Sequence, residues 1–413
     1  MDQPRSALTQ TAAAAAAAPS LPEAHGASAA VAAKRDVRLD LFRGLALWLI
    51  FLDHIPSNAV SWVTIRNYGF SDATEIFVFI SGYTAAFVYG RAMRERGFVL
   101  ATARVLRRAW QIYAAHIFLF MIYMAEIAYV AGSFDNPLYA EEMGILDFLK
   151  QPDVTLIQAL LLKFKPAGMD ILPLYIVLLV GFPPLLWLLQ RLPVVALAAS
   201  VAIYALSWQF DWNMPQYPSG TWLFNPFAWQ LIFVFGAWCA LGGSQRLAPL
   251  IRSPATQGIA VAYLLFAFLI TLTWYFPRYG HYVPRWLADF MYPIDKTDLD
   301  PLRFAHFLAL AVLTVRFVPP DWPPLKSELL RPPVLCGQHS LEIFCLGVFL
   351  AFAAHFFLVE VSGRLSAQVL VSALGIAAMI ATAWLLSWYK KAEGRGSGSG
   401  PKQPDADLAG GEA

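Results

Sequence analysis

The chain has 413 residues, of which 58% are hydrophobic and 14% are charged, and its formal net charge at pH 7 is +2. A soluble globular domain carries roughly 25% charged residues, so this composition excludes an ordinary soluble enzyme. The small net charge gives no reason to expect nucleic acid as a partner. Apolar residues come in blocks close to the ~20 residues that cross a bilayer. We therefore expect an all-α polytopic membrane protein embedded in the lipid bilayer.

In chain order, the apolar blocks predict about ten transmembrane helices within one membrane domain, residues 34–390. Their expected bounds are 40–57, 70–90, 106–131, 170–190, 193–209, 226–243, 256–276, 302–318, 340–360 and 366–389. Residues 1–33 are rich in alanine, and residues 391–413 begin with basic residues and continue rich in glycine and serine. We expect both segments to be disordered cytoplasmic tails.

The charges of the loops predict how these helices are oriented. The loop between the second and third helices carries six arginines and one glutamate, whereas the 132–169 loop is acidic. Short cytoplasmic loops are enriched in lysine and arginine, so the arginine-rich loop is predicted to be cytoplasmic. An even number of helices then places both termini in the cytoplasm.

The first two predicted helices contain ionisable residues that lipid would reject. A charge at the bilayer centre costs at least ~2.5–3.5 kcal/mol, so such residues normally face a protein interior or a wet cavity. Arg43 and His54 are eleven residues apart, which is about three helical turns and roughly 16 Å on one stripe. Asp72 and Glu75 share a face near the outer end of the second helix, at a depth that His54 can reach. We expect this stretch to be the functional centre.

A histidine beside a carboxylate is the minimal general base, because the carboxylate fixes the imidazole tautomer and stabilises its charged form. Glu75 or Asp72 could orient His54 in this way, and the residues do not decide between them. The alternative is a purely structural histidine held by hydrogen bonds. The arginine on the same stripe and the two nearby carboxylates favour the catalytic interpretation.

Further polar residues fall mostly in the outer half of the predicted helices, with Tyr113 and His116 climbing toward mid-membrane from the inner side. Each alone is typical of a helix cap or an interfacial belt. Together they predict a cavity that opens outward and binds an acceptor. The members of this set are His116, Tyr113, Asp170, Asn225, Trp229, Gln230, Lys296 and Arg303.

Arginines gather at the predicted inner ends of the first and third helices, namely Arg38, Arg43, Arg107 and Arg108. The positive-inside rule alone requires basic residues there. A ring of guanidinium groups would equally suit a polyphosphorylated donor. The three cysteines show no metal-ligand spacing, and no metal site is expected.

Several stretches resemble the OpgC family, a group within the acyltransferase-3 superfamily of membrane O-acyltransferases named for succinyl transfer to osmoregulated periplasmic glucans. The resemblance rests on Arg43-Gly44, on His54 late in the first helix, and on the acidic residues before the Phe-Val-Phe-Ile-Ser-Gly-Tyr run. It covers about residues 35–388. The matching stretches are 70–83, 169–175, 224–230, 295–303 and 337–344.

The resemblance implies a ten-helix enzyme of the bacterial inner membrane that takes an acyl group from cytoplasmic acyl-CoA. The acyl group, succinyl in the family's name, would pass to a hydroxyl of a periplasmic glucan or another envelope glycan. Acyl-CoA is then a co-substrate, and no bound cofactor is implied. In such enzymes the chemistry is assigned to a helix-1 histidine, which His54 matches, and the CoA side to basic residues, which Arg43 and its neighbours match.

We therefore predict an O-acyltransferase in which His54 is either the general base or the nucleophile. Two alternatives from other classes stay open. One is a transporter or flippase of an acidic or glycan-linked substrate, which would favour internal repeats and helices broken at mid-membrane. The other is a sensor whose histidine and carboxylates respond to pH without turnover.

Overall fold

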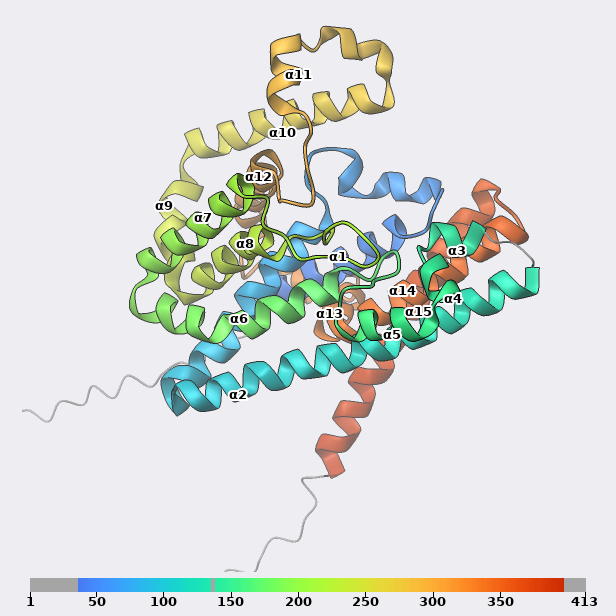
Figure 1. The fold of residues 1–413 in the computed structure, drawn as a ribbon. Helices are drawn as coiled ribbons and strands as arrows, with labels where there is room; N and C mark the ends of the chain where they lie inside the picture. Colours follow the sequence, from blue (N-terminus) through green and yellow to red (C-terminus); the bar gives the residue numbers. More distant parts are fainter. Residues whose placement is uncertain (1–35, 135–137, 397–413) are drawn as a thin grey trace, which may run out of the picture. The chain divides into compact units, whose positions relative to one another are not determined.

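The computed structural model of the chain describes residues 36–134 and 138–396, and the predicted N-terminal tail lies outside this part. Every regular element among the described residues is a helix, which confirms the all-α class (Figure 1). The last helix, α15 (Leu365–Gly396), extends past the predicted end of the membrane domain. Residues 391–396 of the predicted C-terminal tail belong to this helix, and residues 397–413 lie outside the described part.

The longer helices correspond to the predicted crossings. They are α1 (Val37–Asp53), α2 (Ala73–Phe134), α6 (Ile171–Arg191), α7 (Pro193–Gln209), α8 (Pro226–Trp238), α10 (Pro254–Tyr275), α12 (Pro301–Phe317), α14 (Ser340–Glu360) and α15. Shorter elements connect them, namely η1 (Ala59–Val63), η2 (Ile65–Asn67), α3 (Leu138–Glu142), α4 (Leu146–Lys150), α5 (Pro152–Leu160), η3 (Cys239–Gly243), α9 (Ser244–Arg252), η4 (Pro277–Tyr282), α11 (Arg285–Met291), η5 (Pro323–Lys326) and α13 (Arg331–Gln338).

Six of the described helical segments are long and apolar enough to cross a membrane, so the chain is a multi-pass membrane protein. They are Ala73–Phe134, Ile171–Arg191, Pro226–Arg252, Pro254–Tyr275, Ser340–Glu360 and Leu365–Glu393. Three other predicted crossings fall on α1, α7 and α12, each of 17 residues. The count of ten and the cytoplasmic termini stay predictions.

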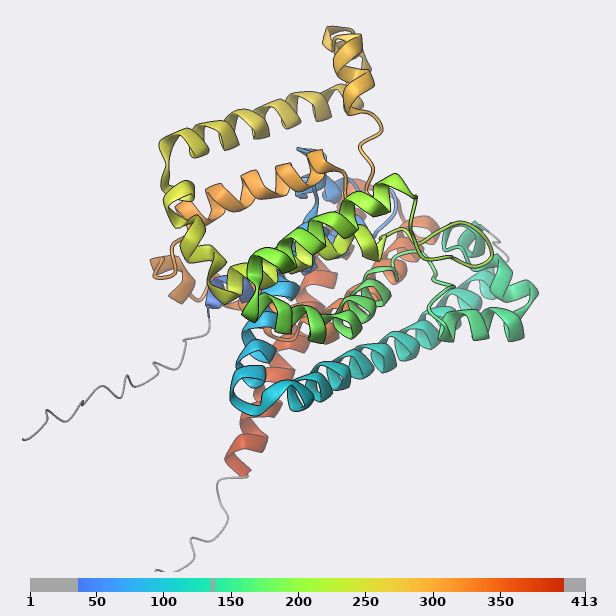
Figure 2. The same ribbon diagram turned by 60° about the vertical axis from the view of Figure 1, so that its left-hand side comes forward.

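Helix α2 combines the second and third predicted crossings. Its 62 residues would span about 93 Å if straight, far more than a bilayer core. Gly97, with φ 83° and ψ 172°, breaks the helix. Both views show the chain turning sharply between the two arms (Figures 1 and 2). The arm of α2 before Gly97 contains Glu75, and the arm after Gly97 contains His116.

Helix α1 lies in the middle of the packing, against α2, α13 and α14. It approaches α13 closely because Gly44 and Gly337 present no side chains: a Cβ on either would collide with the backbone of the other helix, at Pro333 and Asp40. Small residues allow this kind of backbone approach between membrane helices. The close packing fixes the helix that carries Arg43 near one end and His54 at the other.

Two apolar clusters hold the described helices. The larger joins side chains of α1, α2, α6, α8 and α14. The smaller is built around Phe70 and includes Ala267, Ile270 and Met291. Helices α10 and α12 run beside each other in this second region (Figure 2). Phe70 thus connects the loop before α2 to the helix pair that supplies Arg303.

Candidate active site

His54 caps the C-terminal end of α1, and its ring orientation is fixed by the backbone. Nδ1 lies 2.6 Å from the Ile50 carbonyl oxygen and donates to it, because a carbonyl can only accept. Gly168 packs against the ring: it has φ +81°, and a Cβ there would come within 2.9 Å of His54 Cδ2. Within the described chain Nε2 has no hydrogen-bond partner, and the side chain is exposed. The free Nε2 is therefore the atom that can accept a proton.

The expectation that Glu75 or Asp72 orients His54 is not met, because both carboxylates bind cations instead. Arg303 donates to Glu75 Oε1 through Nη2 at 2.6 Å and Nε at 2.9 Å. Arg303 Nη2 is also 3.2 Å from Asp72 Oδ2, and Lys296 Nζ is 2.5 Å from the same oxygen. The Ile50 carbonyl takes the orienting role that we predicted for a carboxylate.

The same two carboxylates cap α2. Asp72 accepts from the Thr74 amide at 2.8 Å, and Glu75 Oε2 accepts from the Asp72 amide at 2.9 Å. This is a capping box, which satisfies backbone donors that the first helical turn leaves unpaired. Glu75 is fully buried, whereas Asp72 is partly accessible. The helix start thus holds Arg303 and Lys296 in fixed positions.

His54 opens into a cavity of about 410 Å³. The structure brings together four of the predicted site residues in its wall, namely His54, Asp72, Lys296 and Arg303. The remaining lining residues are Ile50, Asp53, Arg66, Gly69, Phe70, Ser71, Ala73, Thr74, Trp274 and Tyr275. Lys296, Arg303 and His54 therefore face one space of a size typical for small-molecule sites.

Three of the predicted acceptor residues do not line this cavity. Asn225 donates to Asp298 Oδ1 at 2.6 Å, and the Trp229 indole donates to the Lys296 carbonyl at 3.0 Å. Gln230 bonds to Ser200 on the neighbouring α7. Burial raises the pKa of Asp298, and the Asn225 hydrogen bond opposes this shift. Asn225 and Trp229 thus position the loop that carries Lys296, and contact with an acceptor stays a prediction.

The other predicted acceptor residues lie near a second polar cluster in the 161–170 loop. Lys165 is buried, and its Nζ lies 4.3 Å from the centre of the Trp222 ring. His116 is also buried, and neither its Nδ1 nor Lys165 Nζ has a hydrogen-bond partner in the described chain. Burial lowers the pKa of Lys165 to about 8, and the charge of Asp170 partly offsets this. Tyr113 donates to the carbonyl of Leu160, the last residue of α5, just before this loop.

Of the four predicted donor arginines, Arg43 and Arg108 line one cavity of about 130 Å³. Arg43 is buried and donates to the Thr84 hydroxyl at 2.5 Å. Arg38 instead binds Asp36 and the Val318 carbonyl. Arg107 is exposed and does not line this cavity. The rest of the wall is Phe77, Ser81, Thr84, Ala85, Val88, Tyr89, Ile112, Leu172, Tyr175, Ser340, Leu341 and Phe344.

A third, narrow cavity of about 10 Å³ lies between the two larger ones. It shares Phe344 with the arginine cavity and shares Ile50 and His54 with the 410 Å³ cavity. Its other walls are Leu47, Phe51, Ile343, Gly347 and Val348. This volume holds about one water molecule. His54 therefore stands where an apolar constriction meets a polar cavity.

Sequence reasoning missed Asp53, Arg66 and Phe344 as site residues. Asp53 adjoins His54 in sequence but was expected to point about 100° away on a helix. Helix α1 ends at Asp53, so both side chains reach the same cavity. Phe344 carries no signal beyond apolarity. Gln338, His339 and Glu342, around the start of α14, were visible in the sequence as polar residues, and Ser340 and Leu341 between them line the arginine cavity.

The described residues contain no group of three or more His, Cys, Asp or Glu side chains placed to hold a metal ion. Searches of curated proteins and of solved structures found no match. The family model described as OpgC protein matches residues 35–391, which is nearly the whole chain and includes both arms of α2, the His54 cavity and the arginine cavity. This match confirms the resemblance noted in the sequence, and the chain belongs to the OpgC family.

Proposed function

We propose that the protein is a membrane O-acyltransferase that moves an acyl group from acyl-CoA to a hydroxyl of an envelope glycan. The observation that carries this proposal is the series of three cavities along α1, from Arg43 through Phe344 to His54. An acyl donor held at one end and a hydroxyl acceptor held at the other would meet at the imidazole. Family membership supports the same reaction.

The arginine cavity is the proposed donor side. Guanidinium groups bind phosphate through charge-assisted, often bidentate hydrogen bonds, so Arg43 and Arg108 suit the phosphates of CoA. The walls between them and His54 are mostly apolar, which suits the uncharged arm that carries the thioester. The cavity of about 10 Å³ at Phe344 and Gly347 is smaller than an acyl group. The Phe344 side chain must therefore move when the donor enters.

The reaction step follows from the tautomer of His54. Because Nδ1–H donates to the Ile50 carbonyl, the lone pair of Nε2 faces the acceptor and takes the proton of its hydroxyl. The hydroxyl oxygen attacks the thioester carbonyl carbon, a C–O bond forms, and the C–S bond breaks. The leaving CoA thiolate takes the proton from the imidazolium. An acyl-imidazole formed first on His54 gives the same net reaction in two steps.

Arg303 and Lys296 are proposed to stabilise the negative oxygen that develops during attack. Both side chains lie in the wall of the cavity that contains His54, and both are held in place by Asp72. Fixed positive charge in a partly dehydrated site stabilises such an oxyanion without reorganisation. The carboxylates thereby act on the reaction through the cations and not through the histidine.

We further propose succinyl as the acyl group, periplasmic glucan as the acceptor and the bacterial inner membrane as the location, on the basis of family membership. The arginine cavity would face the cytoplasm, where acyl-CoA is found, and the His54 cavity would face the periplasm. The arginine-rich turn around Gly97 supports this orientation through the positive-inside rule.

Mass spectrometry of periplasmic glucans tests the proposal in cells lacking the gene and in cells complemented with wild type or His54→Gln. We expect a mass increment such as succinyl to disappear on deletion and to return only with wild type. Loss of a general base typically costs 10²–10⁴ in rate. His281→Gln, at an exposed histidine of η4, is the matched control and should restore the increment.

Full restoration by His54→Gln at equal protein level would contradict the catalytic assignment. If no envelope glycan changes on deletion, the acyltransferase proposal for glycans fails, and the transporter hypothesis gains support.

A further inference from the structure

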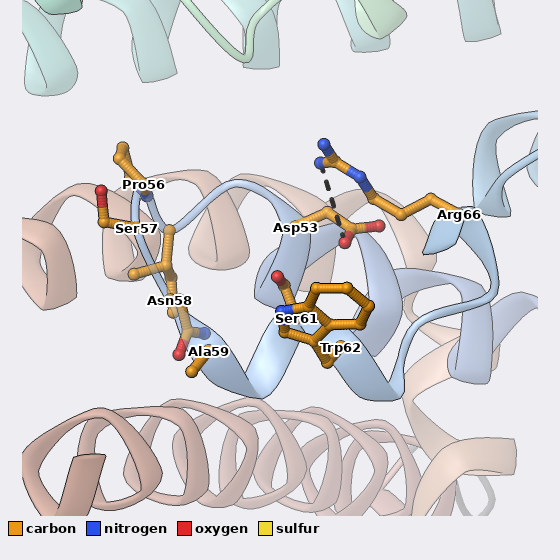
Figure 3. A pocket seen from close by; sticks show the side chains of 9 residues that line it. Asp53, Pro56, Ser57, Asn58, Ala59, Ser61, Trp62 and Arg66 are labelled. Atoms are coloured by element: carbon orange, nitrogen blue, oxygen red, sulfur yellow. Dashed lines mark ion pairs between the residues drawn. The ribbon is translucent and has the colours of Figure 1, made fainter. Parts of the chain in front are cut away.

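A further pocket adjoins the His54 cavity. It is formed by the segment that links α1 to α2. It measures about 480 Å³ and is lined by nine residues between Asp53 and Arg66 (Figure 3). Asp53 and Arg66 belong to the walls of both spaces. The proposed reaction takes place outside this pocket, because His54 does not line it. The wall that it shares with the His54 cavity makes it a candidate binding site.

The segment is held rigidly. The buried Asn58 donates to the Ser372 hydroxyl at 3.1 Å, and the Ala59 amide donates to Gln368 Oε1 at 2.6 Å. The Thr64 hydroxyl donates to Asp53 Oδ1 at 2.7 Å. These bonds join η1 to α15 and to the end of α1. The pocket is therefore organised before any ligand arrives, which reduces the entropic cost of binding.

The polar groups of the pocket retain hydrogen-bonding capacity. Asp53 Oδ1 and Arg66 Nη1 are 3.9 Å apart, a distance too long for a hydrogen bond. Ser57 and Ser61 lie in the lining, and their hydroxyl groups have no hydrogen-bond partner in the described chain. Figure 3 shows Asp53, Arg66 and Trp62 on one side and Ser57 with Asn58 on the other.

One aromatic surface completes the pocket. Trp62 is 45% exposed, and its ring is braced by Tyr275 at a centroid distance of 4.4 Å. A rigid indole beside donors and acceptors of both kinds matches a sugar ring, which has an apolar C–H face and hydroxyl groups around its edge. An acidic and a basic side chain together bind neighbouring hydroxyls through charge-assisted hydrogen bonds.

The near-neutral charge and the polar lining of the pocket disfavour other classes of ligand. One carboxylate and one guanidinium leave it near neutral, so it does not suit the phosphates of CoA. The polar lining equally opposes a purely apolar ligand, because buried polar groups would lose hydrogen bonds to water. The pocket lies at the end of α1 that is remote from Arg43.

We propose that this pocket binds a neutral sugar ring of the acceptor, linked to the ring whose hydroxyl reacts at His54. Asp53 and Arg66 form the boundary between the two spaces, so an acceptor with two linked rings can contact both at once. The proposal rests on the proposed function, because it deepens the choice of acceptor. Trp62 is then a residue that favours oligosaccharides over monosaccharides.

The experiment compares wild type, Trp62→Ala and Trp62→Phe, with a glucose oligosaccharide and a methyl glucoside as acceptors. For Trp62→Ala we expect KM for the oligosaccharide to rise roughly tenfold with kcat unchanged. The reason is that the Trp62 contact stabilises the bound substrate and the transition state equally. KM for the methyl glucoside should not change. Trp62→Phe should recover part of the loss. Trp384→Ala, at an exposed tryptophan of α15, is the control and should match wild type.

Equilibrium dialysis of the same oligosaccharide, without any acyl donor, separates this proposal from the proposed function. Binding by wild type that weakens in Trp62→Ala supports the sugar pocket even if no acyl transfer is found. Transfer by wild type with equal KM values in Trp62→Ala overturns the sugar pocket and leaves the proposed function standing. Absence of both binding and transfer overturns both, and equal losses with the two acceptors overturn the selective role of Trp62.

Discussion

At the scale of single residues, the site is a set of fixed charges around an imidazole that is held by the backbone. His54 Nδ1 is bonded to Ile50, and the carboxylates of Asp72 and Glu75 are bonded to Arg303 and Lys296. This arrangement separates two tasks. The helix backbone sets the histidine tautomer, and the carboxylates place positive charge opposite it.

The buried pair of Arg303 and Glu75 yields the first prediction. Removing one partner of a buried ion pair leaves an uncompensated charge and typically costs about 3–5 kcal/mol. Arg303→Gln should therefore lower the thermal unfolding midpoint in detergent strongly, and Glu75→Gln/Arg303→Gln should recover part of it. Lys296→Gln, which breaks a more exposed pair with Asp72, should cost less than about 1 kcal/mol. Equal midpoints for Arg303→Gln and wild type would contradict this account.

Lys165 yields a pH-dependent prediction. Burial lowers its pKa from 10.5 to about 8, so the folded protein gives up this proton more readily than the unfolded chain. Stability should rise with pH between about 8 and 10.5, and the full penalty is present below pH 8. Lys165→Met removes the charge, and it should be more stable than wild type at pH 7 by up to roughly 3 kcal/mol.

The measurement is the difference in unfolding midpoint between Lys165→Met and wild type across this pH range. This difference should shrink above pH 8. The contributions of other titrating groups to it cancel, because both proteins contain those groups. A difference that is constant with pH would show that the ammonium group is not destabilised in the fold.

Much of the residue-scale site could be predicted from sequence, because ionisable residues in apolar helices are rare. His54, Asp72, Lys296 and Arg303 were predicted on that ground, and one cavity unites them. The pairing within the cavity could not be predicted. It depends on where α12 places Arg303 relative to α2, and no local pattern encodes that contact.

At the scale of elements, α1 connects the two ends of the proposed route. Its sequence predicted a stripe from Arg43 to His54, and the helix Val37–Asp53 contains most of that stripe. The short helix α13, which packs against α1, was not predicted, since Arg331-Pro-Pro resembles a loop. The break at Gly97 agrees with the predicted boundary between two crossings.

Gly347 tests the constriction beside α1. A Cβ at this position would make ordinary contacts, 3.7 Å to Met379 Cε and 3.8 Å to Phe51 Cβ, so Gly347→Ala should fold normally. The methyl group would partly fill the 10 Å³ cavity between the arginine cavity and His54. We expect a lower acyl-transfer rate that falls further with larger acyl groups.

The matched control is Gly181→Ala, because a Cβ there meets no atom within 4 Å and the helix propensity changes equally. An unchanged rate for Gly347→Ala, with every acyl group tried, would exclude this constriction from the route of the donor.

At the scale of the whole described protein, the order of the cavities distinguishes an enzyme from a transporter. Transporters commonly bind their substrate where helices are broken near mid-membrane. In the described residues the break at Gly97 lies between two predicted crossings, and the break at Leu241–Gly242 lies at the end of one. The polar groups instead gather at His54, at the end of a continuous helix. This arrangement favours chemistry at a fixed point over movement of the substrate.

The proposed reaction requires that an acyl group enters at the arginine cavity and leaves on an acceptor bound beyond His54. Inside-out membrane vesicles loaded with glucose oligosaccharide test it directly, with labelled succinyl-CoA supplied outside, at the face that was cytoplasmic. Wild type should transfer label to the enclosed oligosaccharide, and His54→Gln should lose at least 10²-fold in rate. Label found only on oligosaccharide added outside, or equal labelling by His54→Gln, would contradict the account.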